Sequence, residues 1–190
     1  MLYVFHTGRL LCQQDALRAL EAWRGDGFLY VDLEEPTLDE AENIGLRLGL
    51  HADAIEDCMT GQQLPRIDEY GDHVFCICYG FLEDASLETA FEKLTIACGR
   101  SFVLSAHLKP LVTTGRLRHW LESDPTAAER AQPSEIFYRL FDGTVDRLVE
   151  AADRLDERIE QIETDSLEVD PDGEILSRIT GMRPHVSTLR

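Results

Sequence analysis

The chain has 190 residues, 44% of them hydrophobic, so it can bury the core of one domain, or of one domain with an extension. Its formal net charge of −18 creates a surface that repels nucleic acid and anionic lipid headgroups, which excludes both as direct partners. Divalent cations are the natural counter-charge, although solubility alone would also account for this composition.

The N-terminal segment predicts a β-hairpin followed by a helix. Residues 2–5 and 9–13 are short apolar runs on either side of Thr7 and Gly8, which is typical of a hairpin. Asp15 is expected to cap the helix that follows.

A strand and two helices come next. Residues 28–33 predict a strand. Thr37, with Glu40 three residues later, forms the pattern of a capping box, and the helix that begins there is expected to end near Gly49. A second short helix is expected at 52–59.

The middle of the chain completes the predicted sheet. Residues 66–82 and 90–107 each predict two strands joined at a glycine-containing turn. A helix at 109–122 and a polar, proline-containing link at 123–133 follow. We therefore predict an α/β (α+β) fold for residues 1–125, an αβα sandwich with a mixed β-sheet.

Residues 126–190 predict a long helical extension. Apolar residues recur there at an average spacing of about 3.5, the repeat of a coiled-coil-like seam. They are Phe137, Phe141, Val145, Leu148, Ala152, Leu155, Ile159 and Ile162. The helix is expected to break at 170–173 and a further helix to begin near Glu174.

The cysteines and the apolar runs predict a soluble chain in a reducing compartment. Five cysteines make an odd count without the spacing of a disulfide scaffold. The apolar run at the N-terminus is too short for a secretory signal, and no run approaches the roughly 20 apolar residues that cross a bilayer.

Short motifs follow one another along almost the whole chain. They are an aromatic-x-Asp-Leu strand at 30–33, a Pro-Thr-x-x-Glu helix start at 36–40, Leu-His-x4-Glu-Asp at 50–57, Pro65-Arg66 before Tyr70 and Phe75, the hairpin GRSFVLSAH at 99–107, and the start of the long helix at 133–163. Together they resemble the CorA-type family of magnesium and divalent-cation transporters. Tyr30 stands where that family commonly has Trp, Leu64-Pro65-Arg66 replaces its Arg-Pro-Lys, and Ser101 replaces its hairpin Asn.

The resemblance implies a function. It indicates the cytoplasmic, metal-sensing domain of a CorA-like transporter that forms a homopentamer at the inner membrane and responds to Mg²⁺, or to Zn²⁺ or Co²⁺. The stalk, both transmembrane helices and the Gly-Met-Asn pore signature are expected to follow Arg190. A ZntB-type zinc transporter and a free-standing soluble regulatory or scaffold module are the alternatives.

Asp142 and Asp146 are candidate metal ligands on the long helix. Like charges four residues apart on a helix cost about 0.2–0.5 kcal/mol, which a bridging cation would reverse. Mg²⁺ suits such a pair because it takes oxygen ligands and often uses only one or two carboxylates. The alternative is an exposed acidic face relieved by Arg139 and Arg147.

Glu56 and Asp57 form the second candidate pair. They lie at the end of a short helix, where an anion is unfavourable to the helix dipole, so another group is expected to hold them. The resemblance implies that this pair helps to form a divalent-cation site between subunits, with a carboxylate from a neighbour's stalk helix.

The remaining reactive residues predict structural roles. Cys76 and Cys78 share one face of a strand, which favours burial in the core over a zinc site. His51, His73 and His107 are expected to be hydrogen-bonded structural residues. The sequence has no nucleophile elbow, phosphate loop or dinucleotide-binding glycine pattern, and Ser105 with His107 lacks a third residue to orient it, so we predict no catalytic residues and no enzyme.

Overall fold

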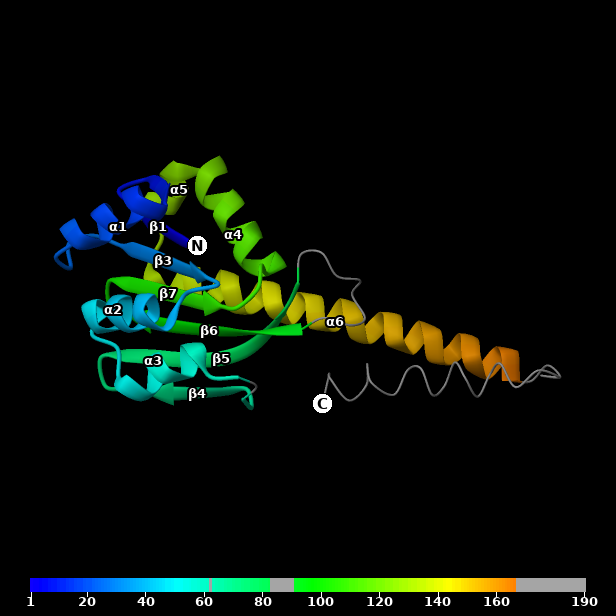
Figure 1. Cartoon of the computed structure of the whole chain (residues 1–190). Coiled ribbons are helices and arrows are strands. Elements are labelled where there is room, and N and C mark those ends of the chain that lie inside the picture. The colour runs from blue at the N-terminus through cyan, green and yellow to red at the C-terminus, as the bar shows by residue number, and fades with distance from the viewer. Residues whose placement is uncertain (62, 83–90, 167–190) are drawn as a thin grey trace.

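A seven-stranded mixed sheet forms the centre of the protein in this computed structural model, which describes residues 1–61, 63–82 and 91–166. The strand order is β2-β1-β3-β7-β6-β5-β4 (Figure 1). The strands are β1 (Leu2–His6), β2 (Arg9–Cys12), β3 (Leu29–Glu34), β4 (Arg66–Glu69), β5 (His73–Phe81), β6 (Phe91–Gly99) and β7 (Phe102–His107). β3 pairs with β7 in parallel, whereas the neighbouring β1–β3 and β6–β7 pairs are antiparallel.

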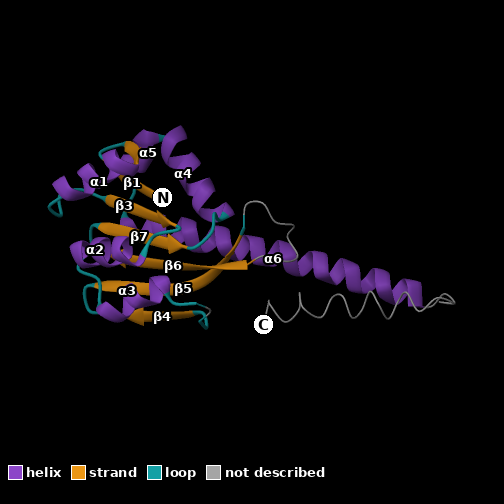
Figure 2. Ribbon diagram, viewed as in Figure 1, coloured by secondary structure: helices purple, strands orange, loops and turns teal. Residues whose placement is uncertain are grey.

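Helices cover both faces of this sheet (Figure 2). One face carries α1 (Gln13–Ala22), α2 (Leu38–Leu48) and α3 (Ala52–Met59), and the other carries α4 (Val112–Ser123), α5 (Pro125–Arg130) and the first part of α6 (Pro133–Ser166). Because successive strand residues point to opposite faces, β5 places Phe75 and Ile77 in the first core and Cys76 and Cys78 in the second. The predicted αβα sandwich with a mixed sheet is confirmed.

The residues at the two ends of α2 predicted its position correctly. The Thr37 hydroxyl accepts a hydrogen bond from the Glu40 backbone N–H at 3.3 Å, and the Glu40 carboxylate accepts one from the Thr37 N–H at 2.8 Å. Gly49 ends the helix at a φ of 75°, a conformation that glycine adopts without steric cost. The predicted capping box and helix end are confirmed.

The predicted cap of α1 is wrong. β2 runs directly into α1, so Cys12 is at once the last residue of the strand and the N-cap, and it caps the helix without a side-chain hydrogen bond. Gln13 makes this sharp change of direction at a φ of 52°. Asp15 lies inside the first turn and pairs with Arg18 at 3.2 Å.

The predicted polar link at 123–133 contains a short helix, α5. The side chain of Asp124 accepts a hydrogen bond from the Ala127 N–H at 3.0 Å, and Pro125 occupies the first turn, where its missing N–H costs nothing. Ala128 is fully buried. Ala128 is the one buried residue among the six of α5, which is too weak a pattern to predict a helix.

The seam predicted along α6 is one residue out of register in its first half. Phe141 and Val145 are 37% and 40% exposed, whereas Ile136, Leu140 and Thr144 are buried. Farther along, Leu155 and Ile162 are buried as predicted, whereas Ala152 and Ile159 are exposed, and the helix extends past the ends of the strands (Figure 1). Apolar residues sit on both neighbouring stripes, so only the position of the sheet decides which stripe turns inward.

The predicted break and final helix of the C-terminal part, and the search for a membrane-spanning helix, are taken together. The break at 170–173 and the helix from Glu174 lie outside the described residues. Over the ranges that are described, we find no helix with both the length and the apolar composition to span a bilayer.

Candidate functional site

The four predicted metal ligands lie on opposite faces of the sheet. Glu56 and Asp57 belong to α3, which packs on the face shared with α1 and α2, whereas Asp142 and Asp146 belong to α6 on the other face. In the part of the chain that the structure describes, no three His, Cys, Asp or Glu side chains are grouped so that they could hold a metal ion. A single chain therefore brings each pair together but does not join the two pairs.

Asp57 is held by other side chains of its own chain. Glu56 points to solvent, while Asp57, the next residue around the helix, is buried. One carboxylate oxygen of Asp57 accepts a hydrogen bond from Gln63 and the other pairs with the Arg66 guanidinium. These contacts identify the groups that stabilise an anion at the unfavourable end of α3.

Lys93 places a second cation beside the same helix end. This β6 side chain is only 4% exposed, and its ammonium group donates to the backbone carbonyls of Asp57 and Thr60. Asp57 lies in the last turn of α3 and Thr60 is the C-cap residue, so neither carbonyl has a donor within the helix. Burial lowers the pKa of Lys93, while the nearby negative charges oppose that shift.

Asp142 and Asp146 are more open. Asp142 is half-buried, and its hydrogen bond and negative charge raise the pKa of the Tyr138 hydroxyl. Asp146 is exposed. Asp142 also lines an open cavity of about 440 Å³ between α4 and α6, together with Trp120 and Arg116.

The arginines that were expected to relieve this acidic pair bind other carboxylates. Arg139 pairs with Glu135 at 2.9 Å, and Arg147 pairs with Glu150 at 2.7 Å. Within the described ranges, neither Asp142 nor Asp146 has an ion pair. Their oxygens therefore suit a hydrated divalent cation better than those of Asp57, which are already occupied.

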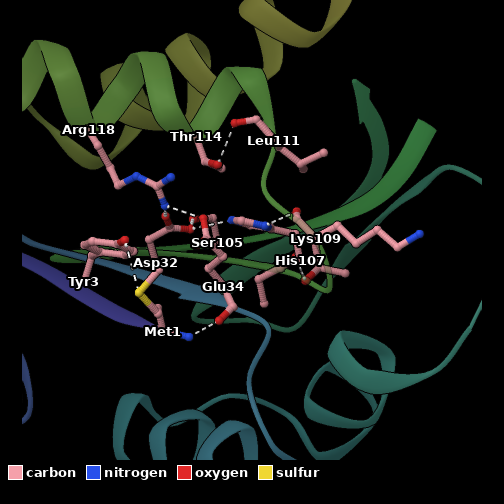
Figure 3. Close-up of polar contacts among 12 residues, drawn as sticks. Met1, Tyr3, Asp32, Glu34, Ser105, His107, Lys109, Leu111, Thr114 and Arg118 are labelled. Atoms are coloured by element: carbon pink, nitrogen blue, oxygen red, sulfur yellow. Dashed lines mark hydrogen bonds and ion pairs between the residues drawn. The ribbon is translucent and has the colours of Figure 1, made fainter. Parts of the chain in front are cut away.

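A buried polar network, which the sequence analysis did not identify, lies where β3 and β7 end (Figure 3). Asp32 is fully buried, and its Oδ1 accepts hydrogen bonds from the Ser105 hydroxyl at 2.6 Å and from His107 Nε2 at 3.1 Å. Its Oδ2 pairs with Arg118 at 2.7 Å, and the same guanidinium nitrogen reaches Glu34 at 2.9 Å. The parallel register sets Asp32 opposite Ser105 and Glu34 opposite His107.

The two partners of His107 favour its positively charged form. Its Nε2 faces the Asp32 carboxylate, and its Nδ1 lies 2.7 Å from the Lys109 carbonyl oxygen. Both partners are acceptors, so both ring nitrogens must carry protons. Arg118 lies between the carboxylates of Asp32 and Glu34, so two basic side chains, His107 and Arg118, face two acidic ones.

The pKa values follow from this geometry. Burial alone would lower the pKa of His107, but the hydrogen bond and charge of Asp32, with the Lys109 carbonyl, raise it on balance. Burial likewise disfavours the Asp32 anion, yet the hydrogen bond and charge of His107, the Ser105 hydroxyl and Arg118 lower the pKa of Asp32. Asp32 and His107 thus each stabilise the charged form of the other.

The prediction that His107 lacks a residue to orient it is wrong, because Asp32 does so. The arrangement still does not activate Ser105. The serine hydroxyl donates its proton to Asp32 instead of facing a free base, and the side chains of Asp32 and His107 are fully buried. The network is therefore a structural element that joins β3, β7 and α4.

The predicted structural roles of the other reactive residues are confirmed. Cys76 and Cys78 are buried in the core beneath α4 and α6. His51 caps α3, since its Nδ1 accepts a hydrogen bond from the Asp53 N–H at 3.3 Å. His73 is buried and lies 2.7 Å from the Asp72 carboxylate.

Comparison with known proteins identifies the family and the relatives of this chain. Residues 25–190 match the model of the family described as CorA-like Mg²⁺ transporter protein. The chain is 28% identical over 134 residues to the putative metal ion transporter YfjQ of Bacillus subtilis, covering 70% of this chain and 41% of that protein. It is 22% identical over 153 residues to the cobalt/magnesium transport protein CorA of Thermotoga maritima, covering 80% and 43%. The chain thus spans less than half the length of these two relatives.

Solved structures share the fold. The soluble domain of CorA from Methanocaldococcus jannaschii superimposes with a TM-score of 0.72 at 17% identity, covering 98% of this chain and 72% of that one. The ZntB cytoplasmic domain from Vibrio parahaemolyticus gives a TM-score of 0.64 at 12% identity, covering 99% and 74%. At these identities the likeness concerns the fold alone.

Proposed function

The chain belongs to the CorA-like Mg²⁺ transporter family, and we propose that it serves as the cytoplasmic, metal-sensing part of a divalent-cation transporter. In this proposal residues 1–125 form the sensing domain and residues 126–190 the helical extension that leads towards a stalk and a pore. The chain itself contributes no catalytic residue. Conduction belongs to other parts of the whole protein.

The observation that carries the proposal is the placement of the two acidic pairs. Glu56 and Asp57 lie on one face of the sheet and Asp142 and Asp146 on the other, and neither pair has a complete ligand set among the described residues. Two faces of one domain can meet only when copies of the chain assemble. A homopentamer in which the acidic faces of neighbours approach one another would complete the sites.

The charge of the chain supplies a mechanism for such a sensor. Each copy carries a formal net charge of −18, so close packing of five copies is opposed by mutual repulsion. Cations bound between subunits neutralise the facing carboxylates and hold the ring closed. When cytosolic Mg²⁺ falls and the sites empty, the repulsion separates the subunits.

Isothermal titration calorimetry tests the role of Asp142 and Asp146. Mg²⁺ is titrated into the chain and into its Asp142→Ala/Asp146→Ala variant, and we expect heat at millimolar metal that the variant loses. Asp153→Ala/Glu157→Ala is the matched control, since it removes two carboxylates four residues apart from the same helix. Equal heats in the chain and the Asp142/Asp146 variant, or no heat in either, would refute the role of this pair.

The likeness to the ZntB cytoplasmic domain supports a second candidate, a zinc transporter. The same titration separates the two, because each proposal names a different preferred ion. Tighter binding of Zn²⁺ than of Mg²⁺ to the carboxylate pairs would favour the zinc transporter. Binding of Mg²⁺ or Co²⁺ in preference to Zn²⁺ would favour the magnesium transporter.

A further inference from the structure

Both oxygens of the Asp57 carboxylate already have partners within the chain. One oxygen accepts from Gln63 and the other pairs with Arg66, and the side chain is only 12% exposed. A divalent cation that coordinated Asp57 directly would share these oxygens with the Gln63 amide and the Arg66 guanidinium, and the positive charge of Arg66 would oppose it. Asp57 is therefore paired with a cation of its own chain at the position that the proposed function assigns to a metal ligand.

Two cations already lie beside this carboxylate. The Arg66 guanidinium is in direct contact with it, and the Lys93 ammonium is bound to the Asp57 backbone carbonyl. Any divalent cation that approached Asp57 would be repelled by both charges. The repulsion is strong at short range because this region is partly shielded from water.

The two cations differ in how easily they can leave. Lys93 is 4% exposed and fixed by two backbone carbonyls. Arg66 is 38% exposed and lies on β4, the edge strand of the sheet. It also has a second partner, since its Nε donates to Asp68 at 2.7 Å from the same strand. Arg66 can therefore release Asp57 and remain bound to Asp68. If Lys93 moved away, the backbone carbonyls of Asp57 and Thr60 would lose the donor that they share.

We propose that Arg66 and a divalent cation compete for the Asp57 carboxylate, so that Arg66 sets the metal concentration at which this site fills. While Arg66 is paired with Asp57, the carboxylate does not bind a divalent cation. When a cation binds Asp57, Arg66 retains only its Asp68 partner. The inference rests on the proposed function, because it concerns the regulation of one of the proposed sensing sites.

Nuclear magnetic resonance with Mn²⁺ as the probe tests this competition. Mn²⁺ broadens the signals of backbone amides close to where it binds, so residues 52–59 report on Asp57 and residues 138–150 on Asp142 and Asp146. In the Arg66→Gln variant we expect broadening of 52–59 at a Mn²⁺ concentration about three to ten times lower than in the parent chain. That ratio corresponds to about 0.7–1.4 kcal/mol of lost competition.

The opposite change should have the opposite effect. Asp68→Asn removes the alternative partner of Arg66 and so confines it to Asp57. We expect broadening of 52–59 to need more Mn²⁺ than in the parent chain. This second variant also keeps the proposal testable should Arg66→Gln fail to give the dispersed spectrum of a folded protein.

Arg18 and Asp15 supply matched controls. They form an exposed arginine–aspartate pair at 3.2 Å on α1. Arg18→Gln and Asp15→Asn change the net charge by the same amounts as the two test variants, and we expect neither to alter the broadening of 52–59. If the control and test variants had equal effects, the change in Mn²⁺ binding would follow from net charge alone, and the proposal would be overturned.

Two further outcomes would overturn it in different ways. If 138–150 broaden with Mn²⁺ but 52–59 respond identically in the parent chain and in Arg66→Gln, the competition is refuted while metal sensing at Asp142 and Asp146 stands. If neither region responds to Mn²⁺ in any variant, both the competition and the proposed metal-sensing function fail.

Discussion

Among single residues, His107 shows how a fully buried ring can be held in its charged form. An isolated buried ion is strongly disfavoured, but here each ionised side chain faces a partner of opposite charge. Asp32 contacts both His107 and Arg118, and Arg118 also reaches Glu34. The network is stable as a unit, and removal of one member would leave another buried charge without its counter-ion.

The free energy of unfolding should depend on pH through this pair. The pKa of His107 is raised from 6.5 in the folded chain, so its stabilising contribution is complete below about pH 6.5 and is lost as the pH rises through the folded value. The pKa of Asp32 is lowered from 3.8, so its contribution is complete above that pH and is lost as the pH falls through the folded value. Urea unfolding between pH 5.5 and pH 9 measures the loss at the high-pH end.

His107→Gln isolates the contribution of this ring. At pH 6 we expect the substitution to cost about 3–5 kcal/mol of unfolding free energy, because it leaves part of the Asp32 charge uncompensated. The cost should shrink as the pH rises, because the parent chain loses the same charge. His51→Gln is the control for replacing a histidine outside the network, since the His51 ring is exposed. A cost that does not vary with pH would contradict a charged His107.

At the scale of helices, the packing of α2 against α3 depends on a glycine. A Cβ atom at Gly45 would lie 2.6 Å from Ile55 Cγ1, closer than two carbon atoms can approach. Ile55 is buried, and its β-branched side chain is stiff at χ1. The close approach of these two helices fixes the position of α3, and hence of Glu56 and Asp57.

Gly45→Ala should therefore destabilise the fold. Replacing a helix glycine by alanine ordinarily gains about 1 kcal/mol, but overpacking here should cost about 1–3 kcal/mol, giving a net loss. Gly143→Ala is the matched control within α6, where the added Cβ would meet Thr113 at 3.4 Å, an ordinary contact. We expect this second variant to gain up to about 1 kcal/mol. Chemical denaturation measures both, and a gain in both would refute the close α2–α3 packing.

At the scale of the whole molecule, the formal net charge of −18 opposes the compact state. Screening by salt should raise the melting temperature, and metal binding to the folded chain should raise it further. At a metal concentration of ten times Kd, binding adds about 1.4 kcal/mol, which corresponds to about 3–6 °C for a chain of this size.

Thermal unfolding in MgCl₂ and NaCl at equal ionic strength separates these two effects. We expect a higher melting temperature in MgCl₂, and the excess should fall in the Asp142→Ala/Asp146→Ala variant. Asp153→Ala/Glu157→Ala should retain the excess, since it changes the net charge equally. Identical melting temperatures in the two salts would argue against a metal site in this chain.

The amino-acid sequence by itself determined most of the elements, α5 excepted, and the fold class. The capping box of Thr37 and Glu40, the glycine turn at Gly49 and the short apolar runs of the strands all act between residues close together in the chain. Such local interactions leave a readable pattern. The family motifs carried the same information about the order of the elements.

Only the tertiary structure decided which side chains meet. The network of Asp32, Ser105 and His107 depends on the parallel pairing of β3 with β7, between residues more than 70 positions apart. The register of α6 depends on where the sheet lies, and the pairing of Asp57 with Arg66 depends on how β4 runs past α3. A local pattern cannot specify these contacts, because their energies arise only when distant segments exclude water together. For the same reason, the predicted acidic pair at Glu56 and Asp57 proved to be one exposed carboxylate and one already bound by an arginine.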